Sequence, residues 1–140
     1  MRTIAIIILM FIGSRLFGAD CGWYSYVGTN QYSFEVSLPV IDKTPIWRES
    51  DDQPPLPARK SLRCARAELS KLFLDASRWR LDSVGLSPIL EHEGHWVYLV
   101  RFYPPAPPGG GVEQGIIQYM TIPVLMSGVA VEPKISRWKR

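Results

Sequence analysis

The sequence predicts an α+β domain in which one amphipathic helix packs on an antiparallel sheet of three or four strands. One segment carries apolar residues at the spacing of a helix, and the segments after it show the alternating, β-branched and aromatic pattern of strands joined by short turns. Strands joined by hairpins are antiparallel, and a helix with a single apolar stripe buries that stripe against one face of the sheet.

The helix is expected over residues 62–79, with Ser61 as its N-cap. Its apolar side chains fall within an arc of about 120°, and most of its charged side chains lie outside that arc. Cys64 lies beyond the edge of the stripe, toward the polar side. The apolar stripe consists of Leu62, Ala65, Leu69, Leu72, Phe73, Ala76 and Trp79.

After the helix, the period of the apolar residues changes from that of a helix to that of strands. The segment from Trp79 toward Leu90 predicts a first strand, and residues 95–103 (HWVYLVRFY) predict the strongest one. Residues 104–114 are rich in proline and glycine and predict a loop that acts as a spacer, although a polyproline docking surface is an alternative. The remaining expected features are a turn at Glu93-Gly94, a strand over 115–126 restricted by Pro123, a turn at Ser127-Gly128 and a returning strand over 129–135.

Residues 1–19 have the pattern of a cleavable signal peptide. Arg2 supplies a positive start, residues 4–12 form an apolar run of nine, and Gly18 and Ala19 are small residues of the kind found at cleavage sites. A membrane-spanning helix needs about 20 apolar residues, so this run is too short to span. We expect cleavage near Ala19 and a secreted or periplasmic protein without a membrane span; a retained short anchor is the alternative.

Removal of the signal peptide changes the charge of the chain. Arg2 and Arg15 leave with it and no acidic residue does, so the formal net charge falls from +3 to +1. A nearly neutral domain lacks the broad basic face that binds phosphate backbones, which argues against nucleic acid as a partner. Only the tail over 137–140 is locally basic, as solvated chain ends often are.

The mature part divides at the start of the predicted helix. Residues 20–60 are expected to form an extended N-terminal segment, with an irregular strand within 20–38 and a proline-rich linker over 39–60 that lies partly against the domain. Residues 61–136 are expected to form the α+β domain itself. About 120 mature residues are enough for one core.

Both cysteines, Cys21 and Cys64, lie in the mature part. Outside the reducing cytosol, two cysteines most simply form one disulfide. That bond would close a loop of about 40 residues and contribute about 4 kcal/mol in the chain-entropy model. Two buried thiols are the alternative, because the sequence does not show whether the two α-carbons approach closely enough.

The order of elements has a counterpart among known domains. The helix, followed by residues 79–86 (WRLDSVGL), 95–102 (HWVYLVRF) and 122–131 (IPVLMSGVAV), is similar to small exported bacterial domains of the PepSY and cystatin-like type. The resemblance covers about residues 61–136 and implies a non-enzymatic module that binds or regulates something outside the cytoplasm. The Gln-x-Val-x-Gly loop of cystatin inhibitors does not occur in a matching place, so inhibition of cysteine proteases is not expected.

Two sets of residues are candidates for a site. Both histidines, His92 and His95, lie within Glu-His-Glu-Gly-His, and imidazole with carboxylate can ligate Zn²⁺ or Cu²⁺; a polar hairpin turn is the simpler interpretation. The strand over 95–103 is apolar on both faces, so Trp96, Tyr98 and Phe102 are candidates for contact with a protein partner or a second copy, unless the N-terminal segment covers that face.

No nucleophile-and-base pattern, phosphate loop or carboxylate pair indicates catalysis or a cofactor. The leading hypothesis is therefore an exported binding or interaction module that is not an enzyme. A metal-binding protein that uses His92 and His95 is the alternative, and an enzyme of unrecognised type is the third hypothesis.

Overall fold

A computed structural model describes residues 21–106 and 118–138. The predicted signal peptide over 1–19 and most of the proline- and glycine-rich loop lie outside the described residues. Within them the elements, in chain order, are β1 (Cys21–Val27), β2 (Asn30–Val36), α1 (Leu38–Ile41), α2 (Ala58–Leu72), the 3-10 helix η1 (Ala76–Arg78), β3 (Arg80–Pro88), β4 (Trp96–Tyr103), β5 (Met120–Leu125) and β6 (Pro133–Arg137).

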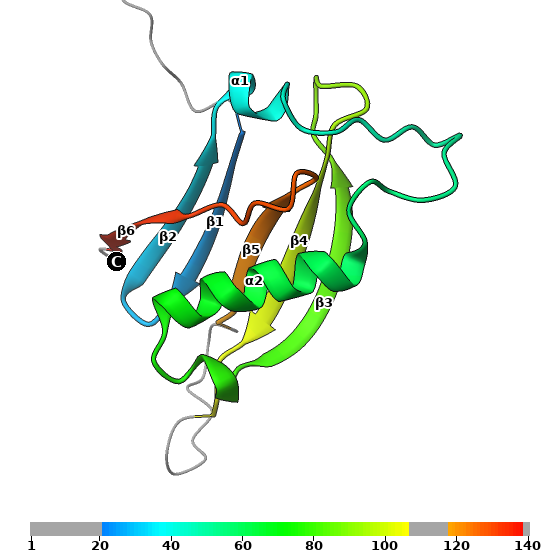
Figure 1. The fold of residues 1–140 in the computed structure, drawn as a ribbon. Helices are drawn as coiled ribbons and strands as arrows, with labels where there is room; N and C mark the ends of the chain where they lie inside the picture. The colour runs from blue at the N-terminus through cyan, green and yellow to red at the C-terminus, as the bar shows by residue number, and fades with distance from the viewer. Residues whose placement is uncertain (1–20, 107–117, 139–140) are drawn as a thin grey trace, which may run out of the picture.

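The strands form two three-stranded antiparallel sheets, with the orders β1-β2-β6 and β3-β4-β5. The predicted α+β class is confirmed, but the expected single sheet of three or four strands is corrected to two sheets. In Figure 1, β1 lies beside β5, and α2 lies across the face of β4 and β5. No helix in the described part of the chain has the length and apolar character needed to cross a membrane.

The two sheets meet where β1 runs beside β5. An isolated backbone bridge pairs Tyr26 with Tyr119. Next to it, the buried Ser25 hydroxyl accepts a hydrogen bond from the Thr121 N–H at 3.0 Å and donates one to the Thr121 carbonyl oxygen at 3.4 Å. One side chain thus satisfies two backbone groups that a regular strand pair would have joined.

The N-terminal segment is more ordered than its composition predicts. Residues 20–38 were expected to hold one irregular strand, but they form the hairpin of β1 and β2, in which Gly28 takes the positive φ of 60° that the turn requires. The proline-rich stretch 39–60 begins with α1 and then follows the domain surface, with Ile41 and Leu56 buried in the core. The first half of the expected N-terminal segment is therefore a hairpin of two strands and not one irregular strand.

The main helix is displaced from its predicted position. It runs over Ala58–Leu72 instead of 62–79, and Pro57 is its N-cap. Ser61 is buried inside the first turn, where its hydroxyl donates to the Ala58 carbonyl at 2.7 Å. Phe73 is extended, and η1 then returns the chain to the core, so Trp79 is buried as predicted although it lies outside the helix.

The C-terminal strand pairs differently from the prediction. The Ser127-Gly128 turn is confirmed by the Gly128 φ of 86° and by its N–H, which donates to the Leu125 carbonyl at 2.8 Å. Beyond Val131 the chain leaves β5, and β6 pairs with β2, which places Asn30 opposite Arg137. Arg137 therefore belongs to a strand and not to the predicted basic tail.

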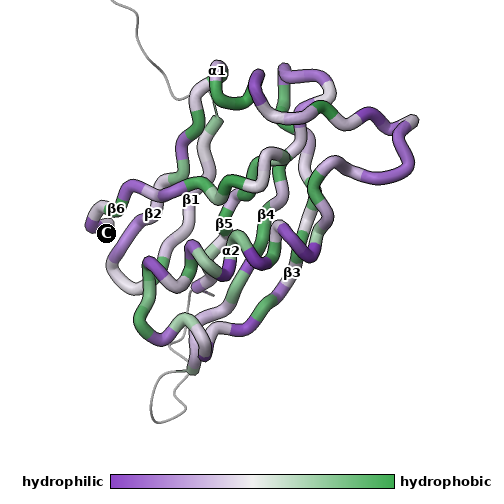
Figure 2. The backbone as a smooth tube through the Cα atoms, in the orientation of Figure 1, coloured by the Kyte–Doolittle hydropathy of each residue, from purple (hydrophilic) through white to green (hydrophobic). Residues whose placement is uncertain are grey.

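The core lies between α2 and strands of both sheets. All six residues of β5 are buried, and Figure 2 shows hydrophobic residues concentrated on β4 and β5. The largest fully buried side chains come from both sheets and the helices, and they include Phe34, Ile41, Leu69, Phe102, Met120 and Ile122.

The two cysteines are not joined to each other. Cys21 opens β1 opposite Val36, and Cys64 lies on α2, which packs against β4 and β5. The two residues occupy different parts of the fold (Figure 1), and the predicted Cys21–Cys64 disulfide is therefore wrong. The N-terminal strand does not cross the helix flank as that bond would require.

Candidate binding groove

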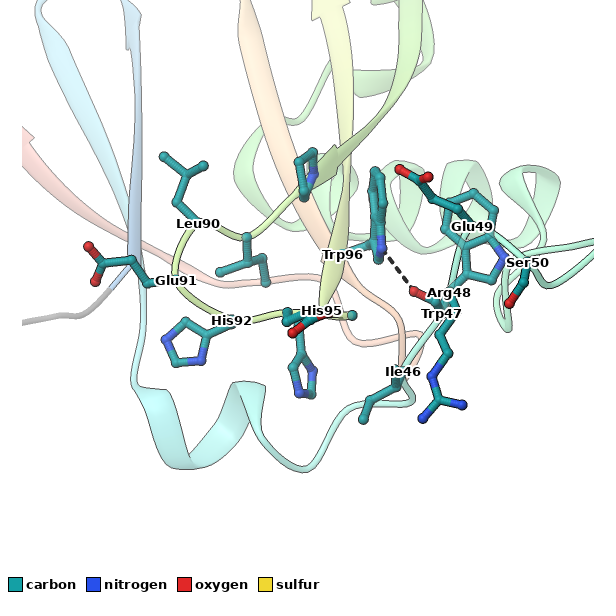
Figure 3. Close-up of a pocket in the computed structure, with 14 residues that line it drawn as sticks. Ile46, Trp47, Arg48, Glu49, Ser50, Leu90, Glu91, His92, His95 and Trp96 are labelled. Carbon is teal, nitrogen blue, oxygen red and sulfur yellow. Dashed lines mark hydrogen bonds between the residues drawn. The ribbon is translucent and has the colours of Figure 1, made fainter.

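A groove of about 990 Å³ separates residues 46–50 from the turn that joins β3 to β4. This volume lies within the range of about 300–1,000 Å³ that is typical of ligand-binding sites. Figure 3 shows the two chain segments facing each other. The groove is lined by Ile46, Trp47, Arg48, Glu49, Ser50, Pro88, Ile89, Leu90, Glu91, His92, Glu93, Gly94, His95 and Trp96.

Two hydrogen bonds and a close glycine contact hold the two walls together. The Trp47 N–H donates to the Gly94 carbonyl at 2.9 Å, and the Trp96 indole N–H donates to the Trp47 carbonyl at 3.1 Å (Figure 3). Gly94 has a φ of 80°, and a Cβ atom there would lie 2.5 Å from Ile46 Cγ2. A glycine is needed at this point both for the turn and for the approach of the other wall.

The groove exposes more apolar surface than a polar turn would. Leu90 is 81% exposed and Ile46 is 52% exposed, while Trp47 and Trp96 are half-buried with ring centroids 5.0 Å apart. Among the described residues, the buried Trp47 Nε1 has no hydrogen-bond partner. Such an indole N–H is unusual in a folded protein, because leaving it unpaired costs about 1–3 kcal/mol.

Carboxylates dominate the rim. Glu49, Glu91 and Glu93 are exposed and line the groove with a single guanidinium, that of Arg48. Figure 3 places Glu49 and Glu91 at opposite ends of the groove. Glu91 also holds a positive φ of 66°, a conformation that costs a residue other than glycine about 1–2 kcal/mol.

The histidines turn toward α1 and help to fix the loop. The buried Thr44 hydroxyl donates to the Ile41 carbonyl at 2.7 Å, so its contact with His95 Nδ1 at 3.0 Å makes that nitrogen the donor. His92 Nδ1 lies 3.6 Å from Asp42 Oδ1. Both rings thus connect the β3–β4 turn with the segment after β2 (Figure 3).

A metal site needs ligands that converge. The rings of His92 and His95 lie 6.4 Å apart, and His95 Nδ1 is engaged by Thr44. Across residues 21–106 and 118–138, no three side chains of histidine, cysteine, aspartate or glutamate come together in a way that could hold a metal ion. The geometry favours the turn interpretation of these two histidines.

The three aromatic residues predicted to meet a partner have different positions. Trp96 lines the groove, but Tyr98 and Phe102 lie in the core. The Tyr98 hydroxyl donates to the Leu56 carbonyl at 2.8 Å, and burial raises the pKa of that phenol. Phe102 is covered by the Arg66 guanidinium at 4.6 Å from the ring centroid. The face of β4 that bears Tyr98 and Phe102 is therefore covered by α2 and the segment before it.

The sequence did not identify the second wall. Residues 46–48 (Ile-Trp-Arg) form the wall opposite the β3–β4 turn, and they stand in a proline-rich stretch. The one sequence feature that could have indicated this wall is the pair of apolar residues next to a proline.

No protein-family model, curated protein or solved structure matches this chain.

Proposed function

We propose that this protein is an exported module that acts by binding, without catalysis, and that its ligand occupies the groove between residues 46–50 and 88–96. The observation that carries the proposal is the exposure of Leu90 and Ile46 inside a concave site. Apolar side chains gathered in a hollow gain free energy when a ligand removes them from water, at about 25 cal/mol for each Å² buried.

The location of the groove supports binding over structural roles. Leu90 stands in a turn, and the turn is attached to the rigid strands β3 and β4. Binding residues are common on loops that a rigid scaffold positions. The exposed leucine adds nothing to the core, whereas Ile89 next to it is buried.

The sequence supports two further parts of the proposal. The pattern of residues 1–19 favours export, and the order of helix and strands over 61–136 favours a PepSY- or cystatin-like arrangement. Both agree with a small binding module that works outside the cytoplasm. The ligand is a protein partner, or a second copy of this chain.

The test places a photo-crosslinking residue in the groove of the full-length chain. We replace Leu90 with p-benzoylphenylalanine, irradiate cells that make the protein, and separate the fractions. The matched control carries the same residue at Leu74, which is 109% exposed and lies outside the groove. We expect an adduct at position 90 only, in the secreted or periplasmic fraction, on a chain that begins near Asp20.

The mass of the adduct distinguishes a partner from a second copy. Adducts of equal yield at both positions, or none at position 90, would contradict a binding role for the groove. An adduct in the cytosolic fraction on a chain that retains residues 1–19 would contradict export.

A further inference from the structure

We propose that the ligand is an extended peptide segment of a partner protein that presents an aliphatic side chain next to a lysine or arginine. This inference rests on the proposed function and specifies its ligand. It is carried by three features of the groove: its charge, its exposed aliphatic side chains and the unpaired indole of Trp47.

The charge of the groove selects a cationic ligand. Three carboxylates, those of Glu49, Glu91 and Glu93, stand on the rim against one guanidinium. The backbone N–H of Arg48 donates to Asp51 Oδ2 at 3.0 Å, which brings a fourth carboxylate close to the same wall. Complementary charge steers a basic partner toward the site and opposes an acidic one.

The apolar residues require a ligand that is also hydrophobic. Leu90 and Ile46 belong to opposite walls, and Trp47 of one wall packs edge-on against Trp96 of the other (Figure 3). A small polyamine would satisfy the carboxylates but would leave these side chains in water. An aliphatic residue beside the cation satisfies both, which is why a peptide fits better than a simple cation.

The unpaired indole N–H of Trp47 is a reason to infer that the ligand supplies a backbone carbonyl as its acceptor. Trp96 Nε1 already donates to the Trp47 carbonyl, but Trp47 Nε1 has no acceptor among the described residues. Trp47 is one of the residues that line the groove, and its ring is half-buried. An extended peptide offers carbonyl groups at regular spacing, and aromatic-lined grooves bind such segments in proteins generally.

The test compares four labelled peptides by fluorescence anisotropy on the purified protein. The parent probe is Ala-Pro-Leu-Arg-Pro-Ala-amide with the fluorophore on its N-terminus, and the others carry Leu-Glu, Leu-Gln or Ser-Arg at the centre. We expect the parent to bind most tightly. Replacing arginine with glutamine should weaken binding about fivefold, as expected for exposed ion pairs, and replacing leucine with serine should weaken it about tenfold. Only the arginine-containing peptides should lose affinity as salt rises.

Variants of the protein test whether the groove residues cause the preference for arginine over glutamine and for leucine over serine in the peptide. Glu91→Gln combined with Glu93→Gln should abolish the preference for arginine over glutamine while keeping that for leucine over serine. Leu90→Ser should abolish the preference for leucine. The matched controls are Glu132→Gln and Leu74→Ser, both exposed and outside the groove, and they should change neither.

Two results would overturn the ligand class. Equal or tighter binding of the Leu-Glu peptide, or no binding of any peptide, excludes a basic aliphatic segment as the ligand. If crosslinking at Leu90 still yields an adduct in that case, the proposed function stands and only the inference on its ligand fails.

Discussion

Replacing Phe102 with alanine should lower the free energy of unfolding by about 3–5 kcal/mol, the usual cost of removing a fully buried phenylalanine. Phe102 is 0% exposed and lies beneath the Arg66 guanidinium, opposite Leu81 and Met120 in the sheet. The loss combines the lost transfer free energy of the ring with the cavity left behind it. Urea unfolding followed by tryptophan fluorescence measures the change.

The change in the free energy of unfolding distinguishes a core role of Phe102 from a partner-binding role. Leu74→Ala is the control, because Leu74 is fully exposed, and its effect should stay within about 0.5 kcal/mol. If Phe102 were an interface residue, its alanine variant would keep its stability. Unfolding at an unchanged denaturant midpoint would therefore contradict the assignment of Phe102 to the core.

Ser25→Ala should destabilise the protein by about 1–3 kcal/mol for each backbone group that it leaves unpaired. The Ser25 hydroxyl satisfies both the N–H and the carbonyl of Thr121, and Ser25 is 1% exposed. The variant removes the hydrogen bond that the Thr121 N–H donates to Ser25 at the junction of β1 and β5. Amide hydrogen exchange at Thr121 should become faster than in the parent protein.

Ser136→Ala provides the matched control for Ser25. Ser136 lies on β6, exposed and opposite Gln31, so its loss should change neither stability nor exchange. Equal stability of the two variants would show that the backbone of β1 and β5 holds the sheets together without the serine. It would contradict the role that the geometry gives to this side chain.

Local periodicity predicted the elements that depend on local contacts. The apolar stripe of the helix and the strands at 80–88 and 96–103 follow from side-chain spacing, and Gly94 and Gly128 both take the positive φ that their turns demand. The helix begins before its predicted start because Pro57, and not Ser61, is its N-cap. Short-range signals identify the element better than its first residue.

Pairing between distant segments could not be predicted in the same way. The first hairpin was missed because Tyr24 and Tyr26 make its exposed face aromatic, which hides the alternation expected of a half-buried strand. The partner of β6 is β2, about a hundred residues away, whereas the turn at Gly128 suggested β5. The groove was not predicted for a similar reason: residues 91–95 were expected only as a turn or a metal site, and the wall that Ile46 and Trp47 provide comes from a remote segment.

The most direct test of the groove as a binding site is the set of tryptophan indole signals in a ¹H–¹⁵N NMR spectrum, recorded as the acetyl-Ala-Pro-Leu-Arg-Pro-Ala-amide peptide is added. Tryptophan-to-phenylalanine variants assign the signals. We expect those of Trp47 and Trp96 to move, while that of Trp79, whose N–H donates to Asp75 Oδ1 at 3.2 Å, stays in place. Unchanged Trp47 and Trp96 signals at saturating peptide, or a shift confined to other tryptophans, would contradict the groove as the site of binding.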